Sequence, residues 1–197
     1  MSAQSVDSAG SVRPRRRFSF ATHWTTQELV TVGVFAAVIK ASTLLVAYVG
    51  GGMNPVSLLA KNCLYAMLMI VLLHKVPKTG TLTLAAFITA FVSLLLMGQG
   101  VLYTPGVLVA CLIAAAVVLL AGGYGKTRNI VLGVLVLELC AKAVSFGSSW
   151  LMLRENPGML FTVGLFVAIG SIGTFIGLVL GTTFMKELRH AGIISHS

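Results

Sequence analysis

The chain has 197 residues, of which 57% are hydrophobic and only 10% are charged, with a mean hydropathy of +0.96. Because soluble domains carry roughly 25% charged residues, this composition excludes an ordinary soluble domain and predicts an all-α integral membrane protein. The net charge of +9 would suit nucleic acid, but the basic residues lie between apolar segments instead of forming a stripe on a folded domain, so we expect no nucleic-acid partner.

Six apolar segments, separated by Gly, Pro and charged residues, are each long enough to cross a hydrocarbon core of about 30 Å. We place the six spans at residues 29–49, 55–73, 80–98, 104–122, 129–151 and 160–184. Together they form one membrane domain over residues 25–190. Residues 1–24 precede it as a basic tail that we expect to be disordered and cytoplasmic, and residues 191–197 form a second cytoplasmic tail.

Basic residues fall almost entirely on one side of these spans. Ten of the fourteen Lys and Arg lie in the N-terminal tail, in the second and fourth connections and near the C-terminus. The opposite connections contain one basic residue, Arg154. Since positively charged loops stay in the cytoplasm, both termini are predicted to be cytoplasmic, in a multi-pass membrane protein.

The first span carries a strip of small residues, Gly33, Ala37 and Ala41, spaced four apart on one helical face. Such a strip lets another helix approach closely, and that helix belongs either to the same chain or to a partner. The last span carries a similar strip, Gly173, Gly177 and Gly181, which we expect to pack against the first span or against a partner.

Four ionisable side chains lie inside spans: Lys40, Lys61, Glu138 and Lys142. A charge within a membrane usually faces a protein interior or a wet cavity. Glu138 and Lys142 are four residues apart and can form an ion pair, either for structure alone or beside a ligand. If all four side chains face one cavity, its excess positive charge suits a ligand with carboxylates or phosphates. The alternative for Lys40 and Lys61 is snorkelling towards the outer interface.

Several polar and aromatic residues lie at the predicted outer ends of the spans. Gly50–Asn54 and Gln99–Tyr103 form two adaptable outer connections, which either gate a pocket or are simple turns, and Trp150 is either a pocket residue or an interfacial anchor. The candidate substrate-binding residues are therefore Lys40, Asn54, Lys61, Gln99, Tyr103, Glu138, Lys142 and Trp150.

The sequence contains no arrangement typical of an enzyme, so we predict no catalytic residue, no metal site and no cofactor. The three cysteines, Cys63, Cys111 and Cys140, lie in apolar segments without metal-ligand spacing, and the histidines are at the cytoplasmic side. A phosphate-binding glycine loop is also missing, so ATP would have to be used by partner subunits.

These features resemble the substrate-binding S components of energy-coupling factor (ECF) transporters. The six short spans and the strip at Gly33, Ala37 and Ala41 are similar to the S-component pattern, whose Ala-xxx-Ala motif engages the coupling subunit. The segments 25–35 (TTQELVTVGVF) and 75–80 (KVPKTG) are similar to the MptD (Trep_Strep) branch. Gly33 at the first position of the strip, with Lys40 beside it, departs from the usual pattern.

The resemblance implies a substrate-specific subunit of an ABC importer in the bacterial plasma membrane. A vitamin, a cofactor, haem or an iron chelate, captured at the outer face, would each fit a cationic pocket lined by Met and aromatic side chains. The resemblance also implies a pocket lined by the later spans and gated by the first and third loops. The implied partners are a membrane coupling subunit (T component) and two cytoplasmic ATPases. Two other functions remain open: an autonomous ion-coupled carrier that uses Glu138 as its titrating acid, and a non-transporting membrane scaffold subunit.

Overall fold

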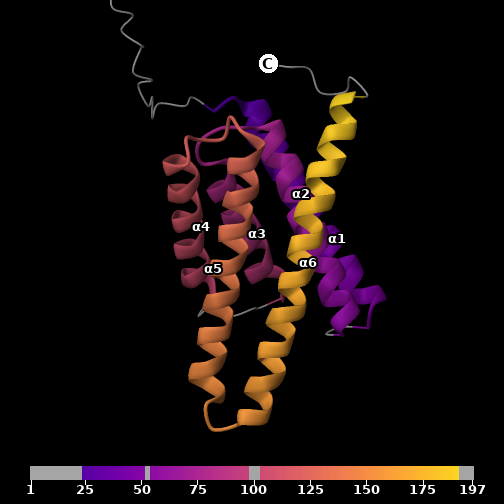
Figure 1. Ribbon diagram of the computed structural model, residues 1–197, viewed down its shortest axis with the longest axis vertical. Coiled ribbons are helices and arrows are strands. Elements are labelled where there is room, and N and C mark those ends of the chain that lie inside the picture. The colour runs from indigo at the N-terminus through magenta and orange to yellow at the C-terminus, as the bar shows by residue number, and fades with distance from the viewer. Residues whose placement is uncertain (1–23, 52–53, 98–102, 191–197) are drawn as a thin grey trace, which may run out of the picture.

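The computed structural model describes residues 24–51, 54–97 and 103–190, and the two predicted tails lie almost entirely outside this part. All regular structure in it is helical, in six helices (Figure 1). Their bounds are α1 Thr26–Val49, α2 Pro55–Lys75, α3 Thr81–Met97, α4 Tyr103–Leu120, α5 Thr127–Leu153 and α6 Pro157–His190. Each predicted span coincides with one helix to within a few residues, the largest difference being the longer α6.

Four of these helices, α1, α2, α5 and α6, are long and apolar enough to cross a membrane, whereas the apolar parts of α3 and α4 are shorter. The chain is therefore a multi-pass membrane protein. The start of α1 and the end of α6 lie at the same end of the bundle as the α2–α3 and α4–α5 connections (Figure 1). This arrangement brings together the connections in which the basic residues are concentrated.

Local sequence explains where the first two helices begin. Thr25 and Glu28 form a capping box, in which the Glu28 amide donates to the Thr25 hydroxyl and the Thr25 amide donates to Glu28 Oε2 at 2.9 Å. At α2, the Asn54 side chain accepts from the Ser57 amide at 2.8 Å, and Pro55 occupies the first helical position. Both helices therefore begin where a side chain satisfies an otherwise unpaired backbone amide.

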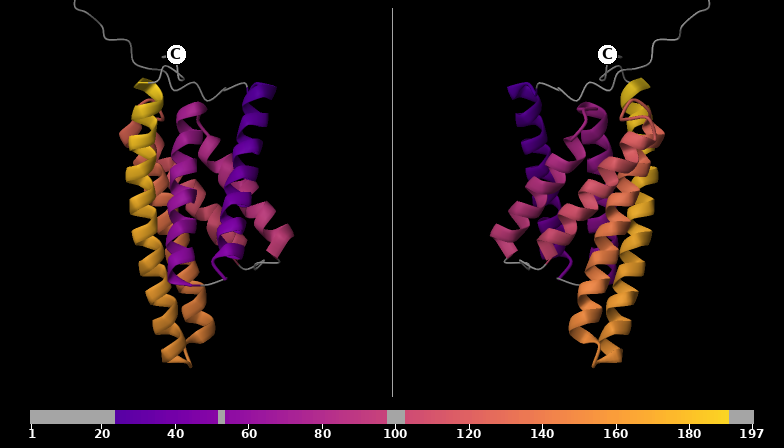
Figure 2. Two further views of the ribbon diagram at one scale, coloured as in Figure 1. Left: turned by 90° about the vertical axis from the view of Figure 1, so that its right-hand side faces the viewer. Right: turned by 90° about the vertical axis from the view of Figure 1, so that its left-hand side faces the viewer.

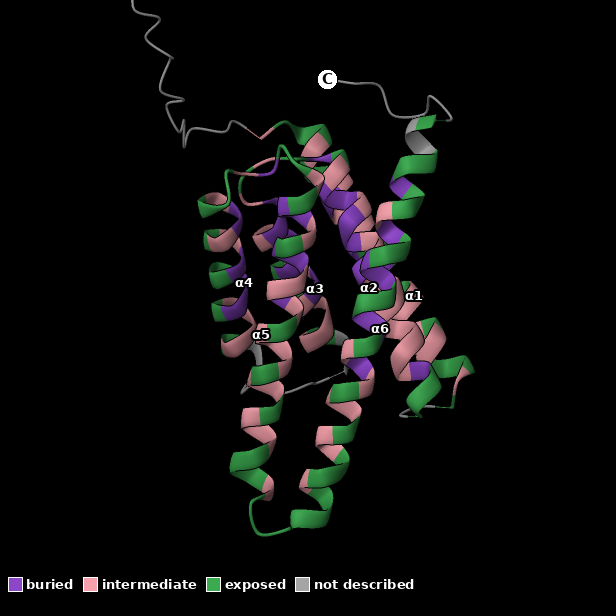
Figure 3. Ribbon diagram, viewed as in Figure 1, coloured by how far each residue is buried: buried purple, intermediate pink, exposed green. Residues whose placement is uncertain are grey.

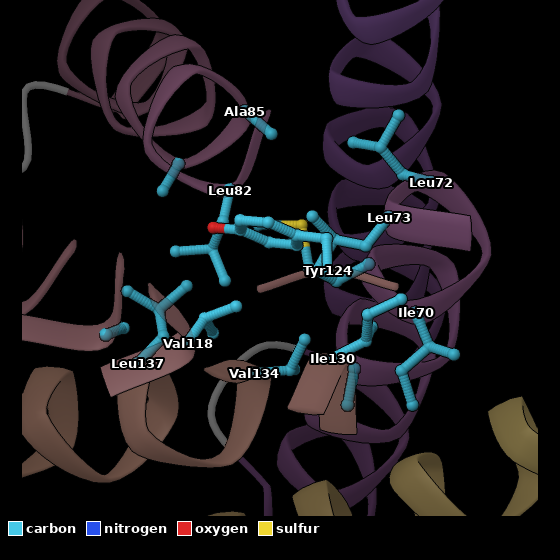
Figure 4. Packing of buried hydrophobic residues seen from close by; sticks show 14 of the residues in the cluster. Ile70, Leu72, Leu73, Leu82, Ala85, Val118, Tyr124, Ile130, Val134 and Leu137 are labelled. Atoms are coloured by element: carbon cyan, nitrogen blue, oxygen red, sulfur yellow. The ribbon is translucent and has the colours of Figure 1, made fainter. Parts of the chain in front are cut away.

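The buried core occupies only the half of the bundle near the chain ends (Figure 3). There the Tyr124 ring lies among apolar side chains that include Leu73, Leu82 and Ile130 (Figure 4). The Tyr124 hydroxyl has no hydrogen-bond partner in the described structure, and burial raises its pKa to about 12. This end of the bundle is thus closed by tightly packed side chains.

At the opposite end, α5 and α6 continue beyond the other helices as a two-helix hairpin (Figures 1 and 2). No residue from 143 to 169 is buried, and the exposed side chains there include Trp150, Met159 and Phe161. The far end of this hairpin therefore lacks a buried core.

Helix α2 is the centre of the packing, because it contacts α1, α3, α5 and, most extensively, α6. The glycine strip of α6 makes the last contact possible. A Cβ atom added at Gly173 would lie 2.5 Å from the carbonyl oxygen of Leu59, and one added at Gly177 would collide with that of Cys63. The expectation that this strip packs against the first span or a partner is wrong, since it packs against α2.

Candidate functional site

A cavity of about 330 Å³ lies among the first five helices. This volume is at the lower end of the range for small-molecule sites, roughly 300–1,000 Å³. Its lining combines charged, hydroxyl-bearing and apolar side chains: Ile39, Lys40, Thr43, Leu58, Lys61, Asn62, Tyr65, Ala86, Thr89, Ala90, Ser93, Val107, Leu137, Glu138 and Ala141. The resemblance implied a pocket lined by the later spans, whereas α1, α2 and α3 supply most of this lining and α6 none.

Two of the predicted lysines, Lys40 from α1 and Lys61 from α2, line this cavity. Neither ammonium group makes an ion pair or a hydrogen bond with the residues that the structure describes. Two like charges held beside a cavity within membrane helices are unfavourable unless an anion neutralises them. The arrangement is therefore suited to a ligand that brings negative charge.

The third lysine, Lys142, is used differently. Its Nζ lies 2.9 Å from Glu138 Oε2 and donates to the Thr174 hydroxyl at 2.5 Å, and both charged side chains are largely buried. The Thr174 hydroxyl in turn lies within reach of Glu138 Oε2 and of the Gly170 carbonyl. Lys142 is thus neutralised beside the cavity and is not part of its lining, whereas Glu138 is.

The sequence analysis missed Thr174, because a single threonine in an apolar span gives no sign of its partners. It also missed five polar lining residues: Thr43, Asn62, Tyr65, Thr89 and Ser93. Thr89 and Ser93 are four residues apart, so their common helical face was available in the sequence. Their hydroxyl protons are donated to backbone carbonyls, which leaves the oxygens able to accept from a ligand.

The remaining predicted substrate residues that the structure describes, Asn54 and Trp150, do not line this cavity. Asn54 is occupied as the cap of α2, where its amide also donates to the Gly50 carbonyl. Trp150 is half exposed on the α5–α6 hairpin. Gln99 lies outside the described residues, and Tyr103 begins α4 with a side chain outside the described part. The structure places only Lys40, Lys61 and Glu138 on the lining, with Lys142 behind Glu138.

The predicted partner strip of α1 faces outward. Ala37 and Ala41 are exposed, and a Cβ atom added at Gly33 would meet nothing within 4 Å. Large apolar neighbours on the same helix, among them Val34 and Val38, are exposed as well. Among the residues that the structure describes, no other helix packs against the strip, which leaves it open to lipid or to another protein in a membrane.

The two segments that carry the family resemblance meet at the end of the bundle where α1 begins. Lys78 Nζ, from the α2–α3 connection, lies 2.6 Å from Glu28 Oε2. A Cβ atom at Gly80, whose φ of +96° favours glycine, would lie 3.6 Å from the Trp24 ring. These contacts fix the start of α1, and with it the strip, against the α2–α3 connection.

Among the described residues, no group of three or more His, Cys, Asp or Glu side chains is placed to hold a metal ion. The lining of the cavity presents lysine ammonium groups and hydrogen-bonding oxygens to a ligand. No protein-family model, no curated protein and no solved structure matches this chain.

Proposed function

We propose that this chain is the substrate-binding subunit of an ECF-type ABC importer in a bacterial plasma membrane. In this proposal all six helices span the bilayer, both termini are cytoplasmic, and the subunit captures a small organic anion at the outer face. The observation that carries the proposal is the cavity of about 330 Å³ that contains the unpaired Lys40 and Lys61. A charged cavity inside a membrane bundle is costly to keep unless it binds something.

The outward-facing strip of Gly33, Ala37 and Ala41 supports the second half of the proposal. A small-residue strip allows close helix contact, and none of the six described helices uses it. In the proposed assembly the membrane coupling subunit covers this strip, and two cytoplasmic ATPases supply the energy. The chain itself would then act without a catalytic residue, a metal or a cofactor.

The alternative of an autonomous carrier requires Glu138 to take up and release a proton. Glu138 is instead held in an ion pair by Lys142 and accepts a hydrogen bond from the Thr174 hydroxyl, so it is not the lone intramembrane acid that such a carrier needs. A scaffold subunit would have no need for a charged cavity. Neither alternative is favoured by a specific observation.

The first test is to purify the full chain and record the mass and absorbance spectra of whatever stays bound. The second is transport by the chain reconstituted in liposomes with its coupling subunit and ATPases. Ala37→Leu and Ala41→Leu should abolish assembly and transport and leave ligand binding intact. Ala168→Leu is the matched control, because it makes the same change at an exposed position of α6.

Wild-type transport by both strip variants would refute the docking surface. Transport by the purified chain alone would support the autonomous carrier instead. If the purified chain retained no ligand and bound none, the cavity would not be a substrate site and the proposed function would be wrong.

A further inference from the structure

The two oxygens of the Glu138 carboxylate have different surroundings. Both hydrogen bonds that Glu138 receives end on Oε2, from Lys142 Nζ at 2.9 Å and from Thr174 Oγ1 at 3.2 Å. Oε1 accepts no hydrogen bond from the described residues, although Glu138 lines the cavity. A carboxylate can accept about four hydrogen bonds, so Oε1 retains its full capacity for a donor inside the cavity.

Asn62 offers a second acceptor on the cavity lining. Its Nδ2 donates to the Leu58 carbonyl at 2.8 Å, one turn earlier on α2. Its Oδ1 accepts no hydrogen bond from the part of the chain that the structure describes. The cavity lining therefore has one hydrogen-bond acceptor on α2, at Asn62, which follows the cationic Lys61. It has a second on α5, at Glu138, whose charge pairs with that of Lys142.

These groups restrict the chemistry of the ligand in two ways. A simple cation is disfavoured by the two unpaired ammonium groups, Lys40 and Lys61. A simple anion would satisfy the lysines but would leave the Glu138 and Asn62 oxygens without donors in a desolvated site, which is costly. We propose that the cavity selects an organic anion that also carries an N–H donor, with its anionic group at Lys40 and Lys61 and its donor at Glu138 Oε1.

This inference rests on the proposed function, since it names the class of ligand that the same cavity takes. The proposed chemistry, an anion joined to an amine, occurs both in soluble metabolites and in the phosphoethanolamine headgroup of a lipid. An experiment must therefore separate the class of ligand from its source.

Phosphoethanolamine and ethyl phosphate form a matched pair of probes, because they share the phosphate ester and differ by one ammonium group. Binding of each to the delipidated, detergent-solubilised full chain is measured by titration calorimetry. We expect both to bind, with phosphoethanolamine tighter by about tenfold or more, as for one additional charge-assisted hydrogen bond. Lys40→Met and Lys61→Met should weaken both probes.

The preference for the amine should disappear in the double variant Glu138→Met with Lys142→Met, which removes both members of the ion pair together with the acceptor oxygens of Glu138. Ser93→Ala, also on the lining, should keep the preference. A further titration adds phosphatidylethanolamine to the detergent micelles. Tighter binding of this lipid than of the soluble probe would identify the source as the bilayer.

Equal affinity of the two probes for the wild-type chain would overturn this inference and leave an anion-binding importer subunit in place. A preference that survives in the double variant would also overturn it. If neither probe binds but the purified chain retains another ligand, the inference fails and the proposed function stands. If the chain retains nothing and binds neither probe, both fail together.

Discussion

The glycine strip of α6 and the small-residue strip of α1 have the same spacing of four residues, yet their surroundings differ completely. A Cβ atom at Gly173 would lie 2.5 Å from a backbone carbonyl oxygen of α2, whereas one at Gly33 would meet nothing within 4 Å. Small residues thus make a helix face smooth enough for close approach. Which helix then approaches depends on the rest of the fold.

Helix α2 matches the α6 strip because it presents its own backbone at the same spacing. Gly173, Gly177 and Gly181 lie against Leu59, Cys63 and Met67, which are themselves four residues apart. Within the described part of the chain, no helix packs in this way against the α1 strip. The same substitution should therefore be strongly destabilising in the α6 strip, which is covered by α2, and nearly neutral in the α1 strip, which is exposed.

The largest effect is expected from Gly177→Leu, compared with Gly33→Leu. A leucine at residue 177 would force α6 away from the α2 backbone and lose the most extensive helix contact, a destabilisation of more than about 4 kcal/mol. The same change at residue 33 points into open space and should leave the free energy of unfolding within about 1 kcal/mol of wild type. Unfolding in detergent, followed by circular dichroism, measures both. Similar losses in the two variants would abolish the distinction between the strips.

The next largest effect is expected at Lys142, which has an ion-pair partner, in contrast to Lys40 and Lys61. Lys142→Met leaves Glu138 buried without its partner, which should destabilise the fold by about 3–5 kcal/mol. The double variant Glu138→Gln with Lys142→Met removes both charges and should recover most of this loss. The same unfolding assay decides the matter, and a double variant as unstable as the single one would mean that the pair is not the cause.

Lys40→Met should behave in the opposite way, because Lys40 has no partner to leave behind. Removing one of two like charges from the cavity should leave the ligand-free protein within about 1 kcal/mol of wild type, or slightly more stable. Lys61→Met serves as the parallel variant. A large loss of stability in either would show that these lysines support the fold and would weaken their assignment to the ligand.

The smallest effect on stability is expected from Ala37→Leu and Ala41→Leu. Both residues are exposed on α1, so the added volume meets no other helix of the chain, and the change in unfolding free energy should stay within about 0.5 kcal/mol. Their effect should instead appear in assembly with the coupling subunit. Marked destabilisation of the isolated chain would mean that the strip has an internal partner.

The sequence was sufficient to locate the helices, because Gly, Pro and charged residues interrupt the apolar segments where the chain turns. It was not sufficient to pair the helices, because apolar residues surround each one and leave no single buried face. The pairing of α6 with α2 depends on atomic fit between two backbones, which the spacing of glycines alone does not encode.

The candidate site was predicted in part for a similar reason. Charged residues within apolar spans are rare enough to be noticed, so Lys40, Lys61 and Glu138 were identified, and the structure places all three on the cavity. Asn54 and Trp150 were chosen for their positions near the outer ends, and neither lies on the cavity. The spacing of Glu138 and Lys142 predicted the ion pair that separates Lys142 from the other two lysines, and the structure confirms it. The contact of Lys142 with Thr174 from α6 is the part that the sequence did not reveal.

The unequal lengths of the helices bear on how this protein deforms the lipid around it. At 1.5 Å per residue, the 17 residues of α3 extend about 26 Å, whereas the 34 residues of α6 extend about 51 Å. A bilayer with a core of about 30 Å is too thick for one side of the bundle and too thin for the other. Mismatch of this kind is relieved by tilting the protein or by thinning and thickening the lipid locally, at a fraction of a kcal/mol per Å. If all six helices span the bilayer, as proposed above, acyl-chain length should therefore influence the tilt of the whole bundle, and with it how far the α5–α6 hairpin extends beyond the hydrocarbon core.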